Sequence, residues 1–161
     1  MLRAIKAKEL YDKTAKVYNP RYRRTQLDKY KIALHDQLLD GEILDLGSGT
    51  GLLSKFLGKR IHQVDVSKGM LLLSRGRRVQ ADIEKLPFRA NKFDYVLSFS
   101  ALMNAEHPEG VIKEVNRVLK SGGIFIVTYL KSFDFTDMLK RHFKLINSRD
   151  CGEDVCFILK N

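Results

Sequence analysis

From residue 42 onward, short apolar runs alternate with segments of helical periodicity. Strand-like runs are expected at residues 42–46, 61–66, 79–81, 93–99 and 124–130, and helices at 52–57, 70–74 and 108–119. Apolar positions 111, 112, 115, 118 and 119 share one face of the last helix, which Gly122 and Gly123 are expected to end. This alternation predicts an α/β fold with a parallel sheet covered by helices.

The first forty residues are expected to form two amphipathic helices. Tyr11, Ala15 and Tyr18 repeat at helical spacing, and Asn19-Pro20 is expected to end that helix. The second helix has apolar positions at 27, 30, 34 and 38 and is expected to end at Asp40-Gly41. We therefore divide one domain, residues 1–161, into a helical cap (1–41) and a Rossmann-like core (42–161).

The C-terminal segment departs from the alternating pattern. After a helix at about 135–142, strand-like runs at 143–148 and 155–159 are separated by only a few residues. A parallel crossover needs a dozen or more residues, so neighbouring strands here must be antiparallel. The expected fold is a doubly wound α/β sheet of about seven strands, mixed in direction, with helices on both faces and a C-terminal antiparallel hairpin.

A glycine-rich bend and three carboxylates are expected at one edge of this sheet. Strand 42–46 runs directly into Gly47, Ser48, Gly49, Thr50 and Gly51, where glycines allow a tight turn and close approach of a ligand. Asp45, Asp65 and Asp82 fall at the ends of three successive strands, and ligands of open α/β sheets bind at that edge. An acid placed like Asp65 accepts hydrogen bonds from ribose hydroxyls in nucleotide sites.

Five segments in order support a family resemblance: ILDLGSGTG, VDVSKGML, ADIEKLPF, FDYVLSFSALMN and EVNRVLKSGGIFIVTY. Their order and spacing resemble class I S-adenosylmethionine-dependent methyltransferases, especially the group with the ubiquinone and menaquinone C-methyltransferases and many small-molecule enzymes. The resemblance covers about residues 42–130. It implies S-adenosyl-L-methionine as cofactor, S-adenosyl-L-homocysteine as product, and a seven-stranded sheet with an antiparallel last strand.

The resemblance also implies a role for particular residues. Around the methionine moiety it places Asp45, near the amino group, and the bend residues Gly47, Ser48, Gly49, Thr50 and Gly51. Around the adenosine it places Asp65 at the ribose, Val66 and Met70 against the adenine, and Asp82 with the Ile83 amide at the adenine edge. Ser98 and Phe99 would lie beside the transferred methyl. Tyr11 and Tyr18 resemble a lid over the cofactor, although core packing accounts for both tyrosines equally well.

Methyl transfer from a sulfonium needs positioning more than covalent help, so no obligatory catalytic residue is expected. His107 is the one candidate general base, and capping of the helix that begins at Pro108 is the alternative for it. Cys151 and Cys156 lack His or Cys partners at a metal-ligand spacing, so no metal site is expected.

The net charge of +10 is concentrated near the N-terminus, where residues 1–31 hold ten Lys or Arg against three acids. This asymmetry favours an anionic partner, such as an anionic small molecule or RNA, although a solvated helical face explains it equally well. The alternative function is a non-catalytic methyltransferase-like module that binds RNA or a partner subunit through these helices. A dinucleotide oxidoreductase is disfavoured because Gly49-Thr50-Gly51 departs from its GxxG spacing.

The longest strongly apolar stretch, residues 122–130, is roughly half of the about 20 residues that a membrane-spanning helix needs. No signal-peptide pattern opens the chain, so a cytoplasmic protein without a membrane span is expected. The acceptor, the methylated atom and the oligomeric state are left open.

Overall fold

The computed structural model describes residues 2–161, with side chains from residue 5 onward. From residue 43 to residue 130 the elements follow in the order β1 (Ile43–Leu46), α2 (Leu52–Leu57), β2 (His62–Asp65), α3 (Lys68–Leu73), β3 (Arg77–Gln80), β4 (Phe93–Phe99), the 3-10 turn η1 (Leu102–Asn104), α4 (Pro108–Val118) and β5 (Leu119–Leu130). A helix precedes each of these strands except β4, which follows β3 through a loop, and the helix before β1 is the N-terminal one. The chain then continues through α5 (Thr136–His142), β6 (Lys144–Cys151) and β7 (Asp154–Lys160).

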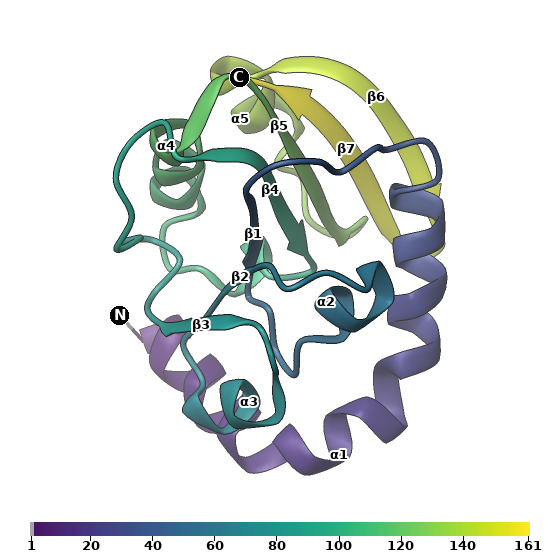
Figure 1. Ribbon diagram of the computed structural model, residues 1–161, viewed down its shortest axis with the longest axis vertical. Helices are drawn as coiled ribbons and strands as arrows, with labels where there is room; N and C mark the ends of the chain where they lie inside the picture. The colour runs from purple at the N-terminus through teal and green to yellow at the C-terminus, as the bar shows by residue number, and fades with distance from the viewer. Residues whose placement is uncertain (1) are drawn as a thin grey trace.

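The strands form one seven-stranded sheet in the order β3-β2-β1-β4-β5-β7-β6 (Figure 1). The first five strands are parallel, whereas β7 lies between β5 and β6 and is antiparallel to both. Gly152, in the turn between β6 and β7, has a φ of 80°, which glycine adopts without strain. The predicted mixed Rossmann-like sheet with a C-terminal hairpin is therefore confirmed.

Each face of the sheet has its own apolar core because successive side chains of a strand point to opposite faces. Leu44 and Leu46 of β1 pack with Val111, Ile112, Val115 and Val118 of α4 on one face. Ile43 packs on the other face with Tyr30 and Ala33 of the N-terminal helix and with Leu52 and Leu53 of α2. Helices therefore cover both faces, as the sequence predicts.

The N-terminal region forms one helix rather than the predicted two. Helix α1 spans Leu2–Ala33 with Pro20 inside it. Figure 1 shows that α1 bends along its length, so its first half lies beside α3 and its last half runs past α2 toward β6. Proline removes one helical hydrogen bond and crowds the preceding turn, but its φ fits a helix, so it bends the helix instead of ending it.

Two smaller predictions are also wrong. Leu38, expected on the apolar face of a second helix, lies beyond the end of α1 and is 90% exposed. Gly122 and Gly123 do not end α4, because α4 stops at Val118 and β5 begins at Leu119. The two glycines lie inside β5, where Gly122 has a φ of 75°. The pairing between β4 and β5 shifts register at this end, between Phe93 and Tyr95.

Candidate functional site

The glycine bend after β1 is held against the end of β2. The amides of Gly47 and Ser48 both donate to the Val64 carbonyl, at 2.8 and 3.0 Å. A Cβ at Gly47 would come within 2.4 Å of the Ala101 Cβ, whereas a Cβ at Gly49 would meet nothing within 4 Å. Both residues have positive φ angles, 67° and 52°. Packing against Ala101 therefore requires a glycine at position 47. At position 49 the backbone faces open space, so a ligand can approach it closely.

Asp65, at the end of β2, ties this bend to α3. One carboxylate oxygen accepts a hydrogen bond from the Gly49 amide at 2.8 Å, and the other accepts one from the Ser67 amide at 2.8 Å. Burial raises the pKa of Asp65, and these two backbone donors oppose that rise. Each oxygen retains a lone pair for a further donor, such as a ligand hydroxyl.

Asp45, the acidic residue of β1, is buried with one of its carboxyl oxygens unpaired within the described part of the chain. Its side chain is 3% exposed, and among the described residues its Oδ2 has no hydrogen-bond partner. Burial and the neighbouring Asp65 charge raise the pKa of Asp45 to about 8. Ser48 Oγ and Gln26 Oε1 also have no partner in the described structure and line the same recess. Such orphaned polar atoms are rare in interiors and are typical of ligand sites.

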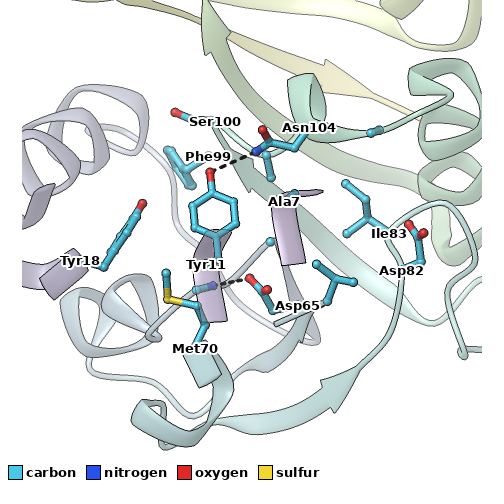
Figure 2. A pocket seen from close by; sticks show the side chains of 15 residues that line it. Ala7, Tyr11, Tyr18, Asp65, Met70, Asp82, Ile83, Phe99, Ser100 and Asn104 are labelled. Atoms are coloured by element: carbon cyan, nitrogen blue, oxygen red, sulfur yellow. Dashed lines mark hydrogen bonds between the residues drawn. The ribbon is translucent and has the colours of Figure 1, made fainter. Parts of the chain in front are cut away.

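The structure gathers the predicted cofactor residues around two adjoining spaces. The larger, which we call the inner cavity, is shown in Figure 2 and includes Tyr11, Tyr18, Gly47, Gly49, Asp65, Val66, Met70, Asp82, Ile83 and Phe99. The smaller, the bend recess, includes Tyr18, Asp45, Gly47, Ser48, Gly49, Thr50 and Phe99. Of the predicted cofactor residues, Gly51 and Ser98 line neither space. The cofactor contacts proposed for Gly51 and Ser98 stay predictions. The cofactor contacts proposed for the residues that line the two spaces stay predictions as well.

Gly51 and Ser98 have packing positions of their own. A Cβ at Gly51 would lie 2.5 Å from Ser74 Oγ, so this glycine allows the bend to approach the end of α3. Ser98 is buried in β4 at 1% exposure, and its Oγ has no partner among the described residues. Phe99 and Ser100, which follow Ser98, reach the inner cavity instead.

The first half of α1 covers the inner cavity. Tyr11 lies centrally in Figure 2, and its hydroxyl accepts a hydrogen bond of 3.4 Å from the Asn104 side chain. The Tyr11 and Tyr18 rings lie edge to face with their centroids 6.3 Å apart, and burial raises the pKa of Tyr18 to about 12. Thr50 of the bend donates to the Asn19 side chain at 2.6 Å, which fastens α1 where it bends. The lid predicted for Tyr11 and Tyr18 therefore has a position from which to act.

Sequence reasoning missed Ala7, Ser100 and Asn104, which also line the inner cavity. Asn104 belongs to the quoted segment FDYVLSFSALMN, so its nearness to the site had a signal in the sequence. Ala7 had none, because its place depends on the path of α1. His107 is exposed and lines neither space, and its side chain makes no cap hydrogen bond to α4. His107 is nevertheless the N-cap residue of α4, because its backbone carbonyl accepts hydrogen bonds from the Gly110 and Val111 amides. The expected capping position is therefore confirmed, and the role of general base stays a prediction.

A third space, the outer cavity, opens beside the inner one. It lies between α1 (from Leu10 to Ile32), η1, and the β6–β7 turn at residues 151–154. Tyr11, Tyr18, Ser100 and Asn104 line both the inner and the outer cavity. The two cavities therefore meet at the carboxyl end of β4.

With this geometry in place, comparison with known proteins identifies the family. A sequence model described as "Methyltransferase domain" matches residues 44–127, which include the glycine bend, Asp65 and Asp82. The chain belongs to this methyltransferase family.

Individual relatives agree with that assignment. An uncharacterised protein of Methanocaldococcus jannaschii is 34% identical over 155 residues, covering 88% of this chain and 60% of the relative. The ubiquinone/menaquinone biosynthesis C-methyltransferase of Chromobacterium violaceum is 36% identical over 106 residues, covering 56% of this chain and 43% of the relative. The chain thus spans about half the length of these curated relatives.

A solved structure matches the fold over nearly the whole chain. It is an S-adenosylmethionine-dependent methyltransferase of Thermotoga maritima, 18% identical, with a TM-score of 0.80 and coverage of 94% of this chain and 98% of that one. This chain therefore has the same fold as that methyltransferase. Across residues 2–161, no helix has both the length and the apolar character needed to cross a membrane.

Proposed function

We propose that this methyltransferase domain binds S-adenosyl-L-methionine in the inner cavity and bend recess and transfers its methyl group directly to an acceptor. The observation that supports this most is Asp45. It is a fully buried carboxylate with an unpaired oxygen beside a glycine bend, and burial raises its pKa to about 8. Its nearest acidic neighbour, Asp65, also has a raised pKa. Asp45 lines the bend recess and Asp65 the adjoining inner cavity, and two such carboxyl groups in adjoining spaces fit a cationic ligand.

The residues present fit the parts of this cofactor. The α-ammonium group matches Asp45, whose Oδ2 lacks a donor, together with the unpartnered Ser48 hydroxyl. The ribose hydroxyls match the free lone pairs of Asp65. The adenine ring matches the apolar side chains of Val66, Met70 and Ile83, with the Asp82 carboxylate at its edge.

The bound cofactor would supply a methyl group already activated by its positive sulfur. The chain's own residues then have to orient and enclose it. Asp45 holds the ammonium group, Asp65 holds the ribose, and the fixed glycine bend sets the depth of the ligand. Tyr11 and Tyr18 on α1 close the cavity against water. Such positioning and desolvation supply most of the rate in a direct displacement.

Calorimetric titration with S-adenosyl-L-homocysteine tests the binding step, with NAD as a matched comparison ligand. We expect the homocysteine compound to bind and NAD not to bind. Asp65→Asn should weaken binding about tenfold or more, because an amide cannot accept hydrogen bonds at both of its polar atoms. Binding of NAD alone would overturn the proposal. If neither compound binds and the protein binds RNA in a salt-sensitive way, the non-catalytic module would be favoured.

The transfer step needs a separate measurement. Methyl transfer from radiolabelled S-adenosyl-L-methionine to pools of small metabolites and of RNA would identify the acceptor class. We expect label in a small-molecule pool, with Asp65→Asn as the control for cofactor-dependent labelling. If no pool is labelled at saturating cofactor, the proposed catalysis is contradicted, whereas the proposal of cofactor binding is not.

A further inference from the structure

Three polar side chains from distant parts of the chain meet where the inner and outer cavities join. The Lys29 ammonium of α1 donates to Ser100 Oγ at 2.5 Å and to Asp154 Oδ2 at 2.8 Å. The Ser100 hydroxyl, just after β4, donates to the same Asp154 oxygen at 2.7 Å. The Lys29 and Asp154 side chains are only 6% and 3% exposed. Lys29, counted in the basic N-terminal excess, is therefore part of a buried cluster and is not free for an anionic partner.

Ser100 holds an unusual backbone conformation in this cluster. Its φ is 56°, in the left-handed region that favours glycine. Its amide donates to the Thr128 carbonyl at 3.0 Å and to the Thr128 hydroxyl at 3.1 Å, which holds the strained conformation in place. A side chain kept where glycine would cost less is typical of functional sites.

The Ser100 hydroxyl has one hydrogen-bonding position left. A serine hydroxyl has one proton and two lone pairs. The proton is donated to Asp154 and one lone pair accepts from Lys29. With Lys29 and Asp154 both fixed, Ser100 presents only an acceptor to any further partner. Because Ser100 lines both cavities, that partner can lie in the outer cavity while touching the boundary of the inner one.

The walls of the outer cavity indicate what kind of molecule fits. Tyr11, Tyr18 and Tyr22 form an aromatic wall along α1, with ring centroids 6.3 Å apart in the first pair and 5.0 Å apart in the second. The charged side chains that line this cavity balance in sign: Arg21, Arg24 and Lys29 against Asp28, Glu153 and Asp154. Such a lining favours an uncharged molecule with an aromatic or apolar body over an anion.

We propose that the outer cavity binds the methyl acceptor, a neutral molecule with an aromatic or apolar body, and that Ser100 accepts a hydrogen bond from its hydroxyl or amine group. Lys29 and Asp154 are positioning residues, since they fix the direction of the Ser100 hydroxyl. The hydrogen bond would hold the acceptor's nucleophilic atom at the junction with the inner cavity. This inference rests on the proposed function, because it assumes that the inner cavity holds the cofactor.

Two simple probes test it: phenol, which has one O–H donor, and anisole, in which a methyl replaces that proton. Both are titrated into ¹⁵N-labelled protein saturated with S-adenosyl-L-homocysteine, and the amide shifts of Ser100 and Asn104 are followed. We expect phenol to bind about threefold to tenfold more tightly than anisole, as one net hydrogen bond implies. Equal binding, or shifts confined to other residues, would overturn the proposal.

Variants separate the hydrogen bond from general damage. Ser100→Ala removes the hydroxyl, and Ser100→Gly does so without backbone strain; both should bring the affinity ratio close to one. The double variant Lys29→Met/Asp154→Leu replaces the buried pair with apolar groups and leaves the Ser100 hydroxyl unoriented, so it should also lose the preference. The control Lys131→Met/Asp150→Leu removes an exposed ion pair with the same 2.8 Å separation. This control should keep the preference for phenol over anisole. A preference retained in all Ser100 variants would overturn the role of Ser100.

Affinity for S-adenosyl-L-homocysteine distinguishes this inference from the one on which it rests. The wild type and the control Lys131→Met/Asp150→Leu should bind that compound within about twofold of each other, because neither Lys131 nor Asp150 lines the inner cavity or the bend recess. If the wild type fails to bind it, the proposed function fails. If it binds and phenol is not preferred over anisole, only the inference about Ser100 fails.

Discussion

The carboxylate of Asp12 accepts a hydrogen bond of 2.6 Å from the hydroxyl of Ser67, 55 positions further along the chain. The same Asp12 oxygen accepts a second bond, 2.9 Å long, from the Gly69 amide. Ser67 in turn accepts from the Met70 amide and caps α3. The lid helix α1 is thus fastened to the short helix that places Met70 in the inner cavity.

Asp12→Ala should loosen the lid. We expect affinity for S-adenosyl-L-homocysteine to fall about twofold to fivefold, a modest effect because the site is exposed. Amide hydrogen exchange in residues 5–18 should become faster. Glu9→Gln, an exposed change on the same half of α1, is the control. Unchanged affinity and exchange would mean that this contact does not hold the lid.

The Asp12 contact should also weaken in acid. Its hydrogen bonds to Ser67 and then Gly69 lower the pKa of Asp12 below the ordinary 3.8. A lowered carboxyl pKa stabilises the docked lid above pH 3.8, and this contribution disappears as the pH falls through the lowered value. Exchange rates of the first half of α1 should therefore rise at the acid end and match those of Asp12→Ala there.

Replacing Asp45 should stabilise the free protein while weakening cofactor binding. Burial, and then the Asp65 charge, raise the pKa of Asp45 from 3.8 to about 8. A raised carboxyl pKa costs stability progressively as the pH rises from 3.8 toward about 8. Asp45→Asn removes that cost and should add on the order of 1–2 kcal/mol at neutral pH, with a higher Tm. Asp28→Asn, at an exposed ion pair, should change Tm little. If Asp45→Asn were less stable than the wild type, the destabilising effect assigned to the buried Asp45 carboxyl would be contradicted.

Cofactor binding should release a proton at neutral pH. Asp45 is largely protonated below about pH 8, and a ligand ammonium favours its ionised form. Affinity for S-adenosyl-L-homocysteine should therefore rise with pH between about 6 and 8 and then level off, by at most about tenfold per pH unit. Titrations in two buffers of different ionisation enthalpy measure the proton directly. The release should vanish in Asp45→Asn; release of equal size there would assign it to another group.

The buried pair of Lys29 and Asp154 should respond very differently to one substitution than to two. Asp154→Leu leaves the buried Lys29 ammonium without its carboxylate and should cost about 3–5 kcal/mol of unfolding free energy. Lys29→Met/Asp154→Leu removes both charges and should be nearly neutral. Urea denaturation with a common m-value measures both effects. Similar losses in the single and double variants would mean that packing, not charge pairing, dominates.

Local patterns were sufficient for most of the fold. The alternation of apolar runs predicted the parallel strands, and the short link between the last two strands predicted the hairpin that β6 and β7 form. Ser67 caps α3 by accepting a hydrogen bond from the Met70 amide, three residues along the chain. These features depend on residues close together in sequence, where spacing alone fixes geometry.

Predictions failed where a local signal was overruled by distant contacts. Asn19-Pro20 was expected to end a helix, but α1 continues through it because both halves are held elsewhere. Asp12 binds α3 on one side of the bend, and Arg149 of β6 donates to the Ile32 carbonyl on the other. A proline alone does not show whether the chain beyond it will find such partners.

The amino-acid sequence by itself determined the α/β order of the strands, the glycine bend and the three acids at the ends of successive strands, because parallel strands bring their carboxyl ends to one edge. Only the tertiary structure decided that α1 closes over that edge, that Asp45 Oδ2 has no donor among the described residues, and that Lys29 meets Ser100 and Asp154 between two cavities. The physical reason is that burial and charge pairing depend on which surfaces pack together, and residues as distant as Lys29 and Asp154, 125 positions apart, have no shared local pattern.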